Sequence, residues 1–78
     1  MLLPMRRRLT YTVEFDREDD GRWIADVPVL PGCMAYGRTR AQAVARVRKL
    51  AAAVVADLMA QREAVPVDQG TAKLTLTV

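Results

Sequence analysis

Alternating hydrophobic and polar positions divide this 78-residue chain into short segments with the two-residue period of β-strands. The alternation is clear over residues 11–15 and again over residues 72–78, where β-branched and aromatic side chains are common. Residues 23–27 form a further alternating segment, and residues 33–36 are a short apolar run. The pattern therefore predicts three strands in the first half of the chain and a fourth at its end.

Two turn signals separate the first three strands. Asp20-Gly21 between the first and second strands is a strong hairpin signal. Farther along, Pro28 and Pro31 each hold the preceding residue in extended geometry. Gly32 follows Pro31 and supplies the positive φ that a type II turn needs. We therefore expect three sequential antiparallel strands.

The middle of the chain, residues 39–62, has the three- and four-residue spacing of an amphipathic helix. Its apolar positions are Val44, Val47, Leu50 with Ala51, Val54 and Leu58. Thr39 followed by Gln42 matches a capping box, and no glycine or proline interrupts the segment. A helix of about 24 residues would be about 36 Å long, much longer than a typical strand. Its C-terminal half is therefore expected to extend beyond the sheet or to pack on a second subunit.

The expected element order is β-β-β-α-β, an α+β fold in which one helix covers one face of a four-stranded sheet. A crossover between parallel strands of one sheet is right-handed. The last strand is therefore predicted to lie parallel beside the first, which gives the spatial order 3-2-1-4. Residues 1–8 are expected to form a flexible basic arm, and residues 9–78 a single domain.

Composition narrows the range of functions. The chain has one cysteine, Cys33, and no histidine, which excludes an internal disulfide, a multi-cysteine metal site and histidine-dependent catalysis. Glu14, Asp16 and Asp26 are the only carboxylates on neighbouring predicted strands, too few to hold two catalytic metal ions. We therefore expect no enzymatic activity and no cofactor or metal. Cys33 is interpreted as a buried core side chain rather than a reactive thiol.

The apolar and charged residues of the sequence do not form the pattern of a targeting signal or of a membrane span. No run approaches the roughly 20 apolar residues of a membrane span, and the short apolar start precedes the arginines rather than following them. A cytoplasmic location without a membrane partner is the expectation.

The net charge is +3, and the basic residues form two clusters. One is the run Arg6, Arg7 and Arg8, and the other includes Arg38 and Arg40 at the start of the predicted helix. Such clusters can bind nucleic acid or an acidic partner, or they can simply be a solvated helix face and terminus. No aromatic residues are interleaved with them as in single-strand binders. A small basic RNA- or DNA-binding module without catalytic activity is therefore one of two candidate functions.

The second candidate comes from a family resemblance. The stretch Val27–Cys33, followed at fixed spacing by Gly37, Thr39 and Ala43, resembles the HicB antitoxin family over residues 9–65. The resemblance implies a degraded, partial RNase H-like fold without nuclease activity. It also implies type II toxin-antitoxin function, in which the chain neutralises a HicA-like mRNA interferase toxin by protein–protein contact. The chain would be a short form of the family that lacks a DNA-binding domain.

The resemblance and the charge pattern together place a partner-binding surface on the first hairpin and the proline-rich segment after it. The candidate contact residues are Glu14, Asp16, Glu18, Asp19, Asp20, Trp23, Pro28, Leu30 and Pro31. The acids form the negative patch able to meet a basic toxin. Trp23 either anchors the partner or packs under the helix. Pro28 and Leu30 are expected to be exposed enough for contact, the alternative being simple loop packing.

Two further features bear on partners. Val29 and Arg38 stand where HicB proteins usually carry acids, which reduces the negative charge available to a basic toxin. Ile24 is expected on the uncovered sheet face, and the alanine-rich helix is apolar on more than one side. Because pairing of strand edges or close approach of helices would cover these residues, we expect a homo-oligomer, at least a dimer.

Overall fold

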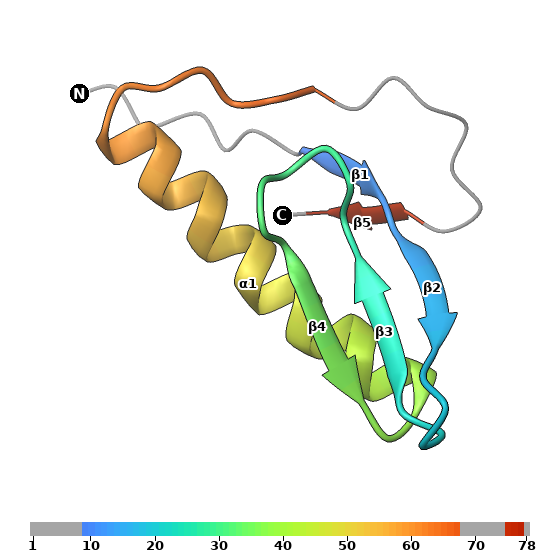
Figure 1. Ribbon diagram of the computed structural model, residues 1–78. Coiled ribbons are helices and arrows are strands. Elements are labelled where there is room, and N and C mark those ends of the chain that lie inside the picture. The colour runs from blue at the N-terminus through green and yellow to red at the C-terminus, as the bar shows by residue number, and fades with distance from the viewer. Residues whose placement is uncertain (1–8, 68–74, 78) are drawn as a thin grey trace.

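The computed structural model describes residues 9–67 and 75–77 (Figure 1). Its elements are β1 (Thr10–Thr12), β2 (Glu14–Arg17), β3 (Trp23–Asp26), β4 (Met34–Gly37), α1 (Arg40–Ala60) and β5 (Thr75–Thr77). The α+β class and the long helix are confirmed, and the expected first strand is divided at Val13 into β1 and β2. The basic arm expected at residues 1–8 lies outside the described residues.

Strands β2, β3 and β4 form an antiparallel sheet in that order, as the turn signals predict. In its register Ala25 of β3 lies opposite Phe15 of β2 on one side and Ala35 of β4 on the other. Helix α1 packs on β3 and β4 and covers this face, and its C-terminal end extends past the edge of the sheet (Figure 1). No element within residues 9–67 and 75–77 covers the opposite face of the sheet, which we call its open face.

The hairpin between β2 and β3 closes as its sequence predicts. Glu18 N–H donates to the carbonyl of Arg22 over 2.8 Å, and Gly21 N–H donates back to the carbonyl of Glu18 over 2.9 Å. Gly21 has a φ of 90°, a conformation that side-chain-bearing residues rarely adopt. The pattern is that of a three-residue hairpin loop with glycine at its last position.

Residues 27–33, which we call the proline loop, make two consecutive turns. Leu30 N–H donates to the Val27 carbonyl over 3.0 Å, and Cys33 N–H donates to the Leu30 carbonyl over 3.3 Å. In the second turn Pro31 precedes Gly32, whose φ of 67° matches the type II requirement. Val27 N–H then bonds the Cys33 carbonyl over 2.9 Å and closes the loop. The loop therefore delivers the chain directly from β3 into β4.

The predicted four-stranded sheet in the order 3-2-1-4 is not observed, and the parallel direction predicted for the last strand is wrong. Strand β5 pairs with β1 in a separate two-stranded sheet, and the pair is antiparallel, with Thr10 opposite Thr77. The ladder between β2 and β3 ends where Glu14 meets Asp26. Two residues further along, the same register would place Pro28 opposite Thr12, and proline has no N–H to donate. The sheet therefore divides, and the four-stranded RNase H-like arrangement is not observed.

The connection before β5 is long enough to permit either direction of this strand. Residues 61–74 separate α1 from β5, long enough for the chain to reverse, so the handedness rule for parallel crossovers does not apply. The side chain of Tyr11 in β1 donates a 2.8 Å hydrogen bond to the carbonyl of Pro66. This bond ties the connection to β1 before the chain returns as β5.

The core lies between α1, the sheet and the proline loop. Its buried side chains are Tyr11, Val13, Ala25, Val27, Leu30, Cys33, Ala43, Val47, Ala51 and Val55. The buried helix positions recur every four residues, and four of the apolar positions expected there, Val44, Leu50, Val54 and Leu58, are only partly buried. Small alanines along the buried stripe allow α1 to approach the sheet closely. No helix in the described ranges has the length and apolar character needed to cross a membrane.

The capping box at the start of α1 is confirmed. Thr39 Oγ1 accepts from Gln42 N–H over 3.0 Å, and Gln42 Oε1 accepts from the N–H of Arg38, one residue before the cap, over 2.7 Å. Gly37 ends β4 so close to the helix that a Cβ atom there would collide with the backbone nitrogen of Ala43. Glycine at this position is what lets the strand end directly at the helix start.

Candidate functional site

Most polar side chains of the three-stranded sheet lie on its open face. Because side chains alternate between the two faces of a sheet, residues out of step with Ala25 point away from α1. They come from all three strands: Glu14 and Asp16 of β2, Ile24 and Asp26 of β3, Met34 and Tyr36 of β4. We call Glu14, Asp16, Asp26, Ile24 and Met34 the acidic sheet face, and these residues line a shallow hollow of about 270 Å³.

The carboxylates of the acidic sheet face are crowded and have no cationic partners among the described residues. Glu14 lies directly opposite Asp26 in the register of β2 and β3, and like charges at such positions destabilise a sheet. In the described part of the chain the one ion pair joins Arg22 and Asp20, so no cation neutralises this group. The hollow therefore combines uncompensated negative charge with the exposed apolar side chain of Met34, 48% accessible.

Metal binding has no support at this surface. Among residues 9–67 and 75–77, no group of three or more histidine, cysteine or carboxylate side chains is placed to hold a metal ion. The carboxylates lie on neighbouring strands around Ile24. This arrangement suits contact with several cationic side chains of a partner better than it suits one metal ion.

The acids expected to form one patch divide into two groups. Glu14 and Asp16 belong to the acidic sheet face, whereas Glu18, Asp19 and Asp20 lie at the hairpin tip. Asp20 accepts hydrogen bonds from Arg22, over 3.0 Å from its backbone N–H and over 2.8 Å from its Nε. These bonds lower the pKa of Asp20. Its charge is thus compensated within the chain, and the hairpin tip offers less net negative charge than the sequence suggests.

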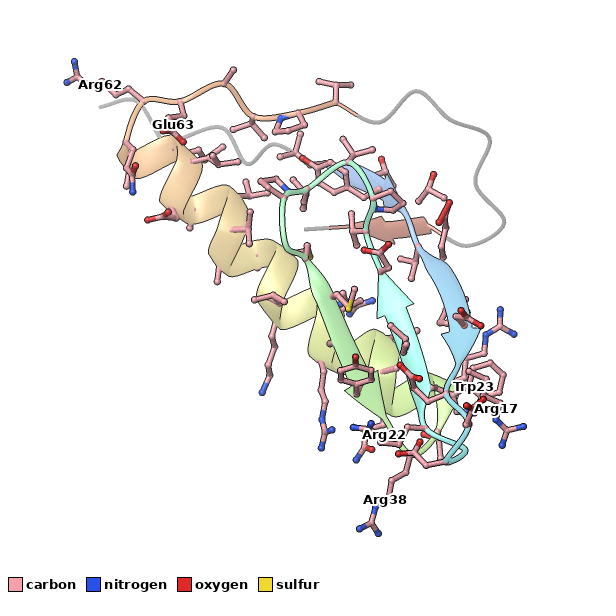
Figure 2. The ribbon with its side chains drawn as sticks, viewed as in Figure 1. Arg17, Arg22, Trp23, Arg38, Arg62 and Glu63 are labelled. Carbon is pink, nitrogen blue, oxygen red and sulfur yellow. The ribbon has the colours of Figure 1, made fainter. Side chains whose placement is uncertain are left out.

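Trp23 lies on the helix side of the sheet. It is half-buried and packs against the core. The guanidinium of Arg17 lies 5.0 Å from its ring centroid, and Figure 2 shows the two side chains together beside the hairpin. Of the two interpretations of Trp23, the structure favours packing, with a cation–π contact covering its outer side.

The proline loop presents a different surface from the one expected. Pro28 and Pro31 are exposed. The exposure expected for Leu30 is wrong, because only 2% of Leu30 is accessible. The two turns of the loop fold its side chain inward over the core. Leu30 therefore stabilises the loop and is not available for contact with a partner.

Cys33 is buried, as its interpretation as a core residue requires. Only 1% of it is accessible, and its Sγ lies 4.0 Å from the carbonyl oxygen of Val47. Burial raises the pKa of the thiol, and the negative charge of Asp26 adds to the increase. A protonated, inaccessible thiol is a poor nucleophile.

Sequence reasoning left Ile24, Asp26, Met34 and Tyr36 out of the candidate surface. The two-residue period over residues 23–27 already placed Ile24 and Asp26 together on one face. The two-residue period does not give the register between β2 and β3. That register decides that Asp26 faces Glu14 rather than another residue.

A comparison with protein-family models finds no match for the chain. The UPF0150 protein Ta0767 of Thermoplasma acidophilum is 32% identical to it over 60 residues, which is 77% of this chain and 87% of that protein. This chain belongs to the UPF0150 family. Any 60-residue stretch of a 78-residue chain includes residues 19–60. The UPF0150 similarity therefore extends over β3, the proline loop, β4 and α1.

Proposed function

We propose that this UPF0150 protein is an antitoxin that binds and neutralises a HicA-like ribonuclease toxin by protein–protein contact. Two things support the kind of partner: the UPF0150 relationship, and the resemblance of Val27–Cys33, Gly37 and Thr39 to HicB antitoxins. Inhibition needs contacts only, because covering the RNA-binding surface of the toxin is enough to stop it.

The observation that carries the proposal is the acidic sheet face. A protein that binds RNA presents positive charge to the phosphate backbone. Glu14, Asp16 and Asp26 offer three carboxylates without cationic partners in the described residues, and a basic surface would relieve their mutual repulsion. Ile24 and Met34 supply apolar area between them, and contacts of that kind hold an interface together after charge has guided the encounter.

We propose the acidic sheet face, rather than the hairpin tip, as the surface that contacts the toxin. Asp20 is neutralised by Arg22, Trp23 packs on the core and Leu30 is buried. Exposed Pro28 and Pro31 remain as contacts at the margin.

The test begins with the neighbouring reading frame. Its product is co-expressed with this chain, and co-purification together with rescue of growth from that product is the expected result. The contact surface is then tested with Asp16→Asn/Asp26→Asn. The matched control is Asp57→Asn/Glu63→Gln near the end of α1, which removes the same charge. Figure 2 shows Glu63 far from the hairpin.

We expect the sheet variant to slow association with the toxin by about tenfold at low salt and to reduce the salt dependence of the rate, while the control changes neither. Removing Asp26 also relieves its repulsion with Glu14, so thermal stability should not fall and unfolding cannot explain the loss. Failure to bind the neighbouring product would overturn the proposal. Equal slowing by both variants would show that the sheet face is not the contact.

A further inference from the structure

A second hollow, of about 460 Å³, lies where the end of β4 meets the start of α1. We call it the basic hollow, and its lining residues are Arg22, Tyr36, Gly37, Arg38, Gln42 and Arg46. The three arginines come from the hairpin, from the residue after β4 and from α1. None of these residues lines the hollow of the acidic sheet face. The two hollows therefore have linings of opposite charge, and Tyr36 of the basic hollow lies opposite Ile24 of the acidic sheet face.

Two of the guanidinium groups are held in position by the fold. Arg22 lies 4.7 Å from the centroid of the Tyr36 ring and pairs with Asp20 over 2.8 Å. Arg46 Nη1 donates to the Tyr36 carbonyl over 3.0 Å. A guanidinium has five N–H donors, so these contacts orient each group and leave further donors for a ligand.

The third guanidinium, that of Arg38, has no carboxylate partner among the described residues. In the first turn of α1, Gln42 N–H bonds Thr39 Oγ1, and just before the helix Arg38 N–H bonds Gln42 Oε1. A ligand in the basic hollow would thus be held by arginine side chains rather than by an uncapped helix terminus. The first turn of α1 contains no acid to neutralise them.

The cations continue beyond the hollow as a row. On α1, Gln42, Arg46 and Lys49 are spaced by four and three residues, which places the cations Arg46 and Lys49 on one side of the helix. From Gln42 to Lys49 this row is about 10 Å long at 1.5 Å per helical residue, and Arg38 lies before its N-terminal end. A row of this length suits a linear polyanion with charges at regular intervals better than one small anion.

We propose that the basic hollow and the row up to Lys49 bind the phosphate backbone of a nucleic acid. Planar guanidinium groups match phosphate oxygens in a two-pronged geometry. This binding uses residues other than those of the acidic sheet face, and its test does not depend on toxin binding.

The test uses the full chain and a fluorescein-labelled single-stranded RNA of about 16 nucleotides, enough to span the site of a single-strand binder. Binding is followed by fluorescence anisotropy between about 50 and 200 mM salt. The variant is Arg38→Gln and the matched control Arg62→Gln, which removes the same charge after the end of α1. Figure 2 shows Arg62 at the opposite end of the molecule from Arg38.

We expect Arg38→Gln to weaken RNA binding about threefold to tenfold and to lower the salt slope by about one. Arg62→Gln should leave both values unchanged. Circular dichroism should be the same for both proteins, because the Arg38 side chain makes no ion pair in the described residues.

Three results would overturn the inference: no RNA binding at low salt, an equal loss from both variants, or full competition by millimolar inorganic phosphate, which would show a small-anion site. Competition by polyglutamate as strong as by unlabelled RNA would show an acidic-protein site instead, and would also contradict it. None of these measurements involves a toxin, so they stand apart from the test of the antitoxin proposal.

Discussion

At the scale of single residues, Cys33 shows how burial alters chemistry. Its thiol lies in the core between the proline loop and α1. Burial, with a smaller effect of Asp26, raises its pKa. At alkaline pH the folded chain therefore binds more protons at this group than the unfolded chain does. The contribution of this thiol to the free energy of unfolding is fully present below the ordinary thiol pKa. It is lost as the pH rises through the higher pKa of the folded state.

We expect the free energy of unfolding to fall at alkaline pH, with Cys33→Ala making the fall less steep. Urea unfolding at a series of pH values measures this. Val47→Ala is the control, because it truncates a neighbouring core residue and keeps the thiol, so it should lower stability at every pH and retain the steep fall. A native thiol that reacts with a disulfide reagent as fast as free cysteine would contradict the assigned burial.

At the scale of elements, the C-terminal end of α1 holds a strained residue. Glu63 N–H donates to the Leu58 carbonyl over 2.9 Å and Arg62 N–H to the Met59 carbonyl over 3.1 Å, the hydrogen bonds of a Schellman motif. Arg62 has a φ of 56°, in the left-handed region where glycine is usually found. The helix therefore ends in a standard way but with an unfavourable residue at the critical position.

Arg62→Gly should stabilise the protein by about 0.5–1 kcal/mol, because glycine adopts this conformation without the steric cost that a side chain carries. Thermal unfolding measures the change. Arg62→Ala is the control: it removes the same charge, retains the strained backbone, and should stabilise nothing. Equal stabilisation by both substitutions would attribute the effect to charge rather than to backbone conformation.

At the scale of the whole molecule, the uncovered surfaces bear on self-association. Met34 and Tyr36 are exposed on β4, which pairs with no strand on its outer edge in the described residues. Ala53 and Met59 are exposed on α1. The carboxylates of the acidic sheet face oppose packing of that face against its own copy. Self-association is therefore expected through the β4 edge or the exposed side of α1.

We expect light scattering at tens of micromolar to report at least a dimer. Met34→Lys places a charge beside the β4 edge, a known deterrent to strand pairing, and Ala53→Lys places the same charge on α1. Whichever substitution lowers the measured mass identifies the interface. A monomeric mass for the unsubstituted chain would contradict the expectation.

The sequence by itself determined the local structure of this protein. Asp20-Gly21, Pro31-Gly32 and the pair Thr39 and Gln42 each adopt the geometry expected of them. Steric limits on φ and hydrogen bonds between near neighbours control such features, so a few adjacent residues suffice to predict them. For the same reason the alternation of strand residues placed Trp23 and Ala25 on the helix side.

Only the tertiary structure decided the long-range features. Strand β5 is antiparallel to β1 because a long connection permits either direction and packing selects one. Leu30 is buried because the loop folds over a core that adjacent residues do not reveal. The pairing of Asp26 with Glu14, and the meeting of Arg22, Arg38 and Arg46, likewise depend on register and on the docking of α1. Contacts between residues distant in sequence depend on the free energy of the whole packed chain, and local propensity does not contain that information.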